Sequence, residues 1–300
     1  MGAKGSAIAS PRRACLSVPG SSEKMLGKAA LLAVDEVVID LEDAVAPAAK
    51  EEARAATVAA LEGLDWKATR VAVRANAPRS RWCVPDLLAL AEAPVPPASI
   101  VLPKTDAPAD VEFAERVLDG AETGAAAIGL QALIESPAAV IAAPSIAASS
   151  PRLESLILGY ADLGAALGRG EAAASRPEIW LAAQEAVLGA ARAAGLQAID
   201  GPYLGTAVDP GLEAAAEWAR VLGFDGKWVI HPAQIERVAE FFTPGEDEVA
   251  QARRVLKLLA DAHDEQGAGA VADGDRMVDE AVAVAARNVL SRAGGSRSPE

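Results

Sequence analysis

The sequence is poor in cysteine and in aromatic residues, and these shortages narrow what the protein can be. Its 300 residues include two cysteines, Cys15 and Cys83, which lie too far apart along the chain to suggest a disulfide framework or a metal cluster. A reduced, cytoplasmic setting is therefore expected. Aromatic residues make up only 4% of the chain, so alanine, valine and leucine must fill most of the core.

Long apolar runs and basic runs are also missing. No stretch of about 18 apolar residues that would span a membrane is present, and residues 1–13 contain no apolar segment typical of a signal peptide. The formal net charge is −14 and no run is rich in lysine or arginine, so nucleic acid is not an expected partner. An anionic ligand remains compatible with this charge where a few cations converge.

What is present is a regular alternation of short apolar runs and helical segments. Most runs are continuously apolar, as in buried parallel strands, and 51% of all residues are hydrophobic, enough for a large core. Helices are predicted over residues 24–32, 48–61, 84–90, 109–118, 137–148, 178–194, 212–222 and 233–241. Strands are predicted over residues 15–18, 36–41, 70–74, 99–102, 127–134, 155–158, 196–199 and 227–230.

Eight strand–helix units in about 240 residues predict an α/β fold, the (β/α)8 TIM barrel, over residues 1–242. Start signals at Ser22, Ser136 and Asp209 and stop signals at Gly195 and Gly223 support the helix boundaries. A doubly wound open sheet is the alternative, and it would need fewer strands or a second domain. Residues 243–300 break the pattern and predict a C-terminal helical extension, with helices over 246–263 and 280–290, a flexible link over 267–269 and an extended segment over 271–278.

Polar residues follow nearly every predicted strand, at the barrel end where active sites lie. Glu135 and Asp162 follow strands five and six, and two carboxylates completed by water and substrate oxygens suit Mg²⁺ or Mn²⁺. Alternatively, each of these carboxylates caps the helix that follows it.

Arg74 ends the third strand and is the best candidate for contact with an anion or a developing oxyanion. A salt bridge to Asp40 or Glu42 is the alternative for Arg74, and the two roles can coexist. Lys104 could likewise contact an anion or form a salt bridge, and the structural role is favoured. Asp40, Glu42 and Asp43 are expected to orient Arg74 and metal-bound water.

The remaining candidates carry weaker signals. Lys24 and Lys28 lie four residues apart on one helical face, where they could bind a phosphate or simply be solvated. For His231, backbone contacts at the barrel rim are favoured over a general-base role. Asp200 is a weak candidate, and His263 is expected to be solvated on a charged helix.

Nine sequence strings together resemble one family. In chain order they are RRACLSVPGSSEKM, VVIDLEDAVAPAAKEEAR, VRANAP, VLPK, LIES, LGYADL, AIDGPYL, GFDGKWVIHPAQI and RMVDEAV. They closely resemble the citrate lyase β-subunit-like group of CoA-ester lyases in the HpcH/HpaI aldolase family. The resemblance runs from about residue 12 to about residue 290.

The resemblance implies a TIM barrel that assembles as a homotrimer or a hexamer and acts on coenzyme A thioesters. It implies that Mg²⁺ is held by Glu135 and Asp162, that Arg74 contacts substrate, and that Lys24 and Lys28 help to hold coenzyme A. Asp279, in the string RMVDEAV, would reach over a neighbouring subunit's site as the acid/base. Asp279 also directly precedes the last predicted helix, and a capping role is compatible with catalysis.

The expected reaction is Mg²⁺-dependent cleavage or formation of a carbon–carbon bond in a 3-hydroxyacyl-CoA such as malyl-CoA, citramalyl-CoA or β-methylmalyl-CoA. The alternatives are a malyl-CoA thioesterase, a citrate lyase β subunit acting on an acyl-carrier-protein thioester, a CoA-independent 2-oxo acid aldolase, and a non-catalytic CoA-binding protein. Ser17, where the family often has an aromatic residue, and the segment over residues 159–178 depart from the family pattern and leave the acyl group open.

Overall fold

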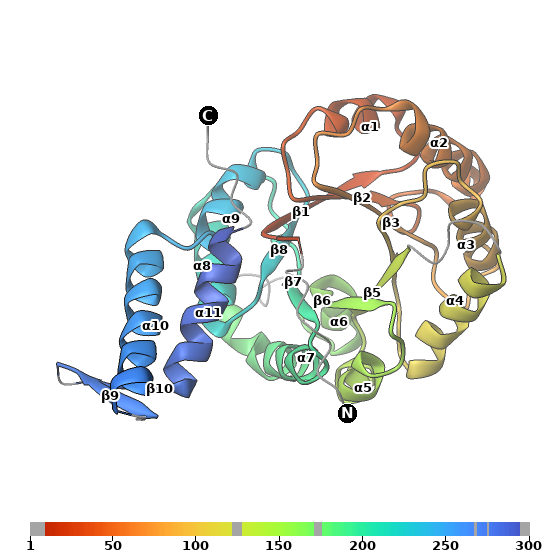
Figure 1. The fold of residues 1–300 in the computed structure, drawn as a ribbon. Helices are drawn as coiled ribbons and strands as arrows, with labels where there is room; N and C mark the ends of the chain where they lie inside the picture. Colours follow the sequence, from red (N-terminus) through yellow and green to blue (C-terminus); the bar gives the residue numbers. More distant parts are fainter. Residues whose placement is uncertain (1–9, 122–127, 171–175, 267–268, 275, 295–300) are drawn as a thin grey trace. The chain divides into compact units, whose positions relative to one another are not determined.

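The chain forms a closed barrel of eight parallel strands. The structure, a computed structural model, describes residues 10–121, 128–170, 176–266, 269–274 and 276–294. Strand β1 pairs with both β2 and β8, which closes the ring (Figure 1). The strands are β1 (Ala14–Pro19), β2 (Glu36–Asp40), β3 (Arg70–Arg74), β4 (Ser99–Leu102), β5 (Gly129–Ile134), β6 (Leu153–Leu158), β7 (Gln197–Asp200) and β8 (Gly226–Val229). The predicted (β/α)8 barrel is confirmed.

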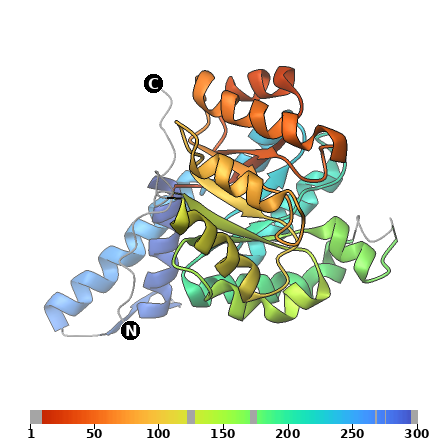
Figure 2. The same cartoon turned by 90° about the vertical axis from the view of Figure 1, so that its right-hand side faces the viewer.

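Helices cover the outside of this ring, and neighbouring helices among α2 to α5 contact one another along it (Figure 2). The helical elements are α1 (Glu23–Ala30), η1 (Pro47–Ala49), α2 (Lys50–Gly63), α3 (Cys83–Ala91), α4 (Pro108–Gly120), α5 (Pro137–Ala147), α6 (Tyr160–Ala166), η4 (Pro177–Trp180), α7 (Leu181–Ala194), α8 (Pro210–Leu222) and α9 (Gln234–Phe242).

The predicted helix boundaries follow from capping. The side chains of Ser22, Ser136 and Asp209 accept hydrogen bonds from backbone N–H groups at the starts of α1, α5 and α8. Gly195 and Gly223 end α7 and α8 with φ angles of 72° and 111°, in the left-handed region that glycine adopts without strain.

The barrel interior is filled by a layer with one residue from each strand. Its members are Cys15, Val38, Ala72, Val101, Leu133, Ile157, Ile199 and Trp228. Alternate residues of a strand face the same side. Asp40, Arg74 and Glu135 each lie two residues beyond a member of this layer, so they face the barrel interior at its carboxyl end.

Helix α6 is the main element that was not predicted. The chain enters it directly after β6, at the N-cap residue Gly159, and no side chain caps its start. Its seven residues therefore carry no sequence signal for a helix start. The predicted helix over 178–194 begins in the structure as the 3-10 turn η4 and continues as α7.

The chain from Glu240 onward forms a compact unit separate from the barrel unit, Arg12–Ala239. It contains α10 (Glu246–Gln266), β9 (Ala270–Asp273), β10 (Arg276–Asp279) and α11 (Glu280–Gly294). The segment predicted as extended is an antiparallel pair of strands, and Gly274 after β9 has a φ of 65°. Residues 267–268 of the predicted link lie outside the described residues. Val255, Val278 and Ala286 form the centre of the unit's own core.

None of the helices among the described residues combines the length and the hydrophobicity that crossing a lipid bilayer requires.

Candidate functional site

Arg74 and Asp40 form a fork-shaped ion pair at the carboxyl ends of β3 and β2. Nε and Nη2 of Arg74 donate to the two carboxylate oxygens of Asp40 at 2.8 and 2.6 Å, and Nη1 lies 3.5 Å from Glu42. Burial alone would lower the pKa of Arg74, but the bonds to Asp40 and the charge of Glu42 raise it, so the guanidinium is permanently charged. The predicted salt bridge is present, and it holds the Arg74 side chain in place.

Lys104 is a second cation among the carboxylates at this end of the barrel. Its ammonium group bonds to Glu42, lies 3.3 Å from a carboxylate oxygen of Asp43 and lies 3.7 Å from Oδ2 of Asp162. Lys104 has a φ of 50°, a conformation that is strained for a residue with a Cβ atom. Its backbone N–H donates to Oε1 of Glu135 at 2.7 Å, which helps to hold this conformation. Lys104 therefore connects three strand ends, as the favoured structural role predicts.

Glu135 is buried beside other carboxylates. Its side chain does not cap α5, because Ser136 does so. Burial and the charge of Asp162 raise the pKa of Glu135 to about 7, and the backbone bond from Lys104 opposes this shift. The room for Glu135 depends on Gly159, since a Cβ atom there would lie 2.6 Å from the Cβ of Glu135.

Asp162 lies in the first turn of α6 and is not its N-cap residue. Its Oδ2 atom is buried and has no hydrogen-bond donor among the described residues. The ammonium group of Lys104 at 3.7 Å is an ion-pair partner, too distant for a hydrogen bond. A buried carboxylate oxygen without a hydrogen-bond donor is unusual in folded proteins, and this one has the chemistry to accept a cation.

The pair Glu135 and Asp162 fits a hard divalent cation. Among the residues that the structure describes, no three histidine, cysteine or acidic side chains are placed to enclose a metal. Mg²⁺ keeps several waters and often takes only one or two protein carboxylates, so a pair is sufficient. The repulsion that raises the pKa of Glu135 also favours a cation beside it.

A cavity of about 500 Å³ lies next to this cluster, between β1, β2 and α1. Asp40, Asp43 and Arg74 line it, together with Ser17 and with Lys28 on α1. A ligand in this cavity would therefore contact both a cation of α1 and the guanidinium at the strand ends. Lys24, one turn earlier on α1, is exposed and is not among the lining residues.

The weaker candidates have structural roles. Asp200 pairs with the buried Lys227, their charged atoms 2.5 Å apart. His231 is exposed, and its Nδ1 accepts a backbone bond from Ala233 at 3.2 Å, which agrees with the favoured reading of a rim residue. His263 is exposed on α10.

Asp279 lies at the end of β10 and caps α11. Its Oδ1 atom accepts a hydrogen bond from the backbone N–H of Val282 at 3.2 Å, so the capping role is present. Asp279 belongs to the C-terminal unit, and the other candidates belong to the barrel unit. Its predicted catalytic role stays a prediction.

Sequence reasoning missed Tyr160 and Lys227. Tyr160 lies two residues beyond the end of β6, and Lys227 lies inside the otherwise apolar strand β8, fully buried. A lysine within a predicted buried strand is a signal that a carboxylate must lie nearby, since an unpaired buried charge is costly. Here that carboxylate is Asp200.

Comparison with known proteins agrees with the sequence resemblance. The model of the family described as HpcH/HpaI aldolase/citrate lyase matches residues 13–232. An L-malyl-CoA/beta-methylmalyl-CoA lyase of Cereibacter sphaeroides is 35% identical over 292 residues, which cover 90% of this chain and 91% of that protein. A (3S)-malyl-CoA thioesterase of Cereibacter sphaeroides is 37% identical over 289 residues, 95% of each chain.

Among solved structures, the protein CitE of Mycobacterium tuberculosis in complex with magnesium, acetoacetate and coenzyme A is similar over nearly the whole chain. The TM-score is 0.75 and the identity 32%, covering 96% of this chain and 99% of that one. The family model matches residues 13–232, and both relatives are more than 30% identical over at least nine-tenths of the chain. The chain belongs to the HpcH/HpaI aldolase/citrate lyase family.

Proposed function

We propose that the chain is a Mg²⁺-dependent carbon–carbon lyase that cleaves a 3-hydroxyacyl-CoA to an acyl-CoA and a 2-oxo acid. One observation carries the proposal: the cavity lined by Lys28 is also lined by Arg74, and the charge of Arg74 acts on Glu135, which in turn interacts with Asp162. One ligand can therefore contact the cation of α1 and Arg74 at once, and we place the metal-bound end of that ligand toward Glu135 and Asp162. Two relatives support this reading. One is named L-malyl-CoA/beta-methylmalyl-CoA lyase, and the other is a solved structure in complex with magnesium, acetoacetate and coenzyme A.

The carboxylates Glu135 and Asp162 would hold Mg²⁺, with water and substrate oxygens as its other ligands. When bound there, Mg²⁺ supplies Lewis-acid chemistry and a template for the carboxylate and hydroxyl oxygens of the substrate. The five carboxylates Asp40, Glu42, Asp43, Glu135 and Asp162 are accompanied by three cations, Arg74, Lys104 and Lys50. This excess of negative charge favours a divalent cation.

Cleavage breaks the bond between the hydroxyl carbon and the carbon next to the thioester. The electron pair moves into the thioester as an enolate, the hydroxyl proton leaves, and the hydroxyl carbon becomes the carbonyl of the 2-oxo acid. Arg74 would hold the enolate oxygen, a charge that exists only along the reaction path. Asp279 of a neighbouring subunit would take the hydroxyl proton, and the enolate then gains a proton to give acyl-CoA.

The coenzyme A portion would extend from the strand ends toward α1. Lys28 lines the cavity, and Lys24 lies one helical turn away, so both can approach a phosphate group at its mouth. A CoA-independent aldolase would have no use for this pair. A subunit working on a carrier-protein thioester would have less use for an Asp279 of its own.

Hydrolysis of the thioester is the second candidate. The relative named (3S)-malyl-CoA thioesterase is as similar as the lyases, at 37% identity. In that reaction Asp279 would activate a water molecule, and malyl-CoA would give malate and free coenzyme A.

The test is product analysis with malyl-CoA, citramalyl-CoA and β-methylmalyl-CoA, with and without Mg²⁺. We expect glyoxylate or pyruvate to appear together with the matching acyl-CoA, only when Mg²⁺ is present. Free coenzyme A without a 2-oxo acid would instead establish the thioesterase. Neither product from any of the three substrates would contradict the proposal.

A further inference from the structure

Helix α6, which carries Asp162, begins without a capping side chain such as those of α1, α5 and α8. Helices α1, α5 and α8 start with Ser22, Ser136 and Asp209, whose side chains bond to the first backbone N–H groups. The N-cap residue of α6 is Gly159, which has no side chain to bond. A helix of only seven residues has little intrinsic stability, so tertiary contacts must fix where it starts.

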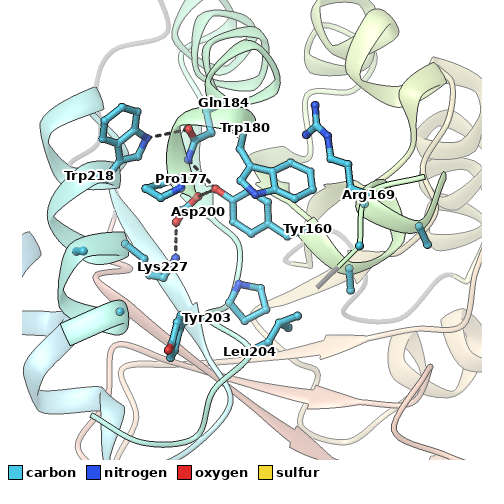
Figure 3. Close-up of a pocket in the computed structure, with 18 residues that line it drawn as sticks. Tyr160, Arg169, Pro177, Trp180, Gln184, Asp200, Tyr203, Leu204, Trp218 and Lys227 are labelled. Carbon is cyan, nitrogen blue, oxygen red and sulfur yellow. Dashed lines mark hydrogen bonds and ion pairs between the residues drawn. The ribbon is translucent and has the colours of Figure 1, made fainter. Parts of the chain in front are cut away.

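Tyr160, the first residue of α6, makes those contacts (Figure 3). Its hydroxyl group donates a hydrogen bond to the carboxylate of Asp200 and accepts one from Nε2 of Gln184 at 2.7 Å. Gln184 is fixed in turn, because its Oε1 atom accepts from Nε1 of Trp218 at 3.0 Å. The start of α6 is thereby tied to the end of β7 and to helices α7 and α8.

Asp200 is a fixed acceptor for Tyr160. Its Oδ2 atom lies 2.5 Å from Nζ of Lys227, which also donates to the backbone oxygen of Gly201 at 2.7 Å. Both charged side chains are almost completely buried. A Cβ atom at position 201 would lie 2.8 Å from the Tyr160 ring, so the ring packs directly on the glycine backbone.

These groups line a cavity of about 380 Å³ that also contains Trp180 and Tyr203. Trp180 supports Tyr160 from the side, with ring centroids 5.0 Å apart. The polar groups of Tyr160, Asp200 and Lys227 are paired with one another or with Gln184 and the backbone. A network satisfied in this way serves to hold structure in place.

The position of the Asp162 carboxylate depends on how Tyr160 is held. Residues two apart in a helix point to different sides, so Tyr160 faces the cavity while Asp162 faces away from it. No hydrogen bond to a described residue fixes Oδ2 of Asp162. The backbone of the first turn of α6, together with the ion pair to Lys104 at 3.7 Å, therefore determines where this oxygen lies.

We propose that Tyr160 is a positioning residue: its hydroxyl group, held between Asp200 and Gln184, sets the start of α6 and so places the carboxylate of Asp162 for metal binding. The inference rests on the proposed function, in which Asp162 is a Mg²⁺ ligand. Tyr160 itself touches neither substrate nor metal.

The test is titration of the purified full-length chain with Mg²⁺ by calorimetry, without substrate. For Tyr160→Phe we expect the Kd for Mg²⁺ to rise roughly tenfold, the lower end of the range for changing a partner that orients a metal ligand. Calorimetry with coenzyme A should give an unchanged Kd, because Lys28 and its cavity lie on other elements. A general loss of structure would weaken both.

Tyr203→Phe is the matched control. Tyr203 lines the same cavity, but its hydroxyl group bonds to Asp209 at the start of α8, at 3.1 Å, and not to the α6 network. This variant should bind Mg²⁺ as the wild type does. Equal Mg²⁺ affinity in Tyr160→Phe and Tyr203→Phe would overturn the inference.

Asp162→Asn separates this inference from the proposed function. If Asp162→Asn loses Mg²⁺ binding while Tyr160→Phe keeps it, the metal site is correct and the role of Tyr160 is wrong. If Asp162→Asn binds Mg²⁺ normally, the metal site itself is misplaced, and the inference falls with it.

Discussion

At the scale of single residues, Arg74 combines two tasks that only a guanidinium performs together. Two of its nitrogens bond to Asp40, while it also lines the cavity that Lys28 lines. Asp40 is almost fully buried, so removing the positive charge would leave an unpaired buried carboxylate. The informative substitution therefore keeps the charge and removes the planar fork.

We predict that Arg74→Lys lowers kcat for the CoA-ester substrate by about 100- to 1000-fold, the usual effect of losing a donor to a developing oxyanion. The affinity for Mg²⁺ should change little, because Arg74 is not a proposed ligand. Steady-state kinetics and calorimetric Mg²⁺ titration of the same preparation measure both quantities. A kcat within a few-fold of the wild type would remove Arg74 from the chemistry.

The two thiols provide a second residue-scale prediction. Cys15 and Cys83 are buried, and burial raises the pKa of both, that of Cys83 to about 12. Because the thiolate is the reactive form, neither should react with a disulfide reagent in the folded protein at mildly alkaline pH. Both should react in concentrated denaturant. Rapid labelling of the native protein would show that a buried position is wrong.

How far residue roles could be predicted depends on how local their signals are. Glu135, Asp162 and Arg74 could be proposed because each follows a recognisable strand. The left-handed backbone of Lys104 and its bond to Glu135 could not, because they arise from strand ends that meet only in the folded barrel. Tyr160 was missed for the same reason, since its partners Asp200 and Gln184 lie at least 24 residues away.

At the scale of elements, the packing after the carboxyl end of β6 requires a glycine. Gly159 lies where a Cβ atom would approach the Cβ and Oε2 atoms of Glu135 to 2.6 and 2.8 Å. Glycine at this position therefore gives the proposed metal ligand on β5 its space. This crowding, unlike a turn, has no signature in the sequence.

We predict that Gly159→Ala displaces Glu135 and weakens Mg²⁺ binding about as much as Glu135→Gln does. Overpacking should also lower the free energy of unfolding by about 1–3 kcal/mol. Gly189→Ala on α7 is the control, because a Cβ atom there meets nothing within 4 Å. That change should stabilise the helix slightly. Calorimetry and chemical denaturation measure the two effects, and normal Mg²⁺ affinity in Gly159→Ala would contradict the crowding argument.

Capping residues were predicted for three helix starts, while the uncapped helices α2, α3 and α4 were predicted to within two residues from their apolar pattern. Helices α1, α5 and α8 begin at their predicted capping residues, and α7 and α8 end at predicted glycines. Helix α6 has no capping side chain and was missed. The pair β9 and β10 was predicted as one extended segment, although Asp273-Gly274 at the end of β9 is a hairpin signal that could have divided it.

At the scale of the whole molecule, we propose that the site is completed by a second chain. The resemblance places Asp279 over the site of a neighbouring subunit in a homotrimer or hexamer, and we retain this as a proposal. Catalysis would then require two chains, Arg74 from one and Asp279 from the other. Such an arrangement is typical of head-to-tail contacts that close into a ring.

We predict that Asp279→Asn and Arg74→Lys are each severely impaired alone but restore activity when mixed. After the chains are exchanged in equal amounts, roughly a quarter of the sites should combine an intact Arg74 with an intact Asp279 from a neighbour. Asp279→Asn should keep its affinity for Mg²⁺. Activity of the mixture no higher than that of the two variants alone would place Asp279 in the site of its own chain, or outside catalysis.

The central claim is that Glu135 and Asp162 hold the Mg²⁺ on which carbon–carbon cleavage depends. The most direct measurement is 2-oxo acid formation from malyl-CoA when Mg²⁺ is added to metal-free wild-type protein and to Glu135→Gln. We predict that the wild type begins to form glyoxylate on addition of Mg²⁺. Glu135→Gln should bind Mg²⁺ about 100-fold more weakly, the upper end of the range for disturbed metal sites. This variant should therefore form little glyoxylate. Glyoxylate formation by the metal-free wild type, or normal formation by Glu135→Gln, would contradict the account.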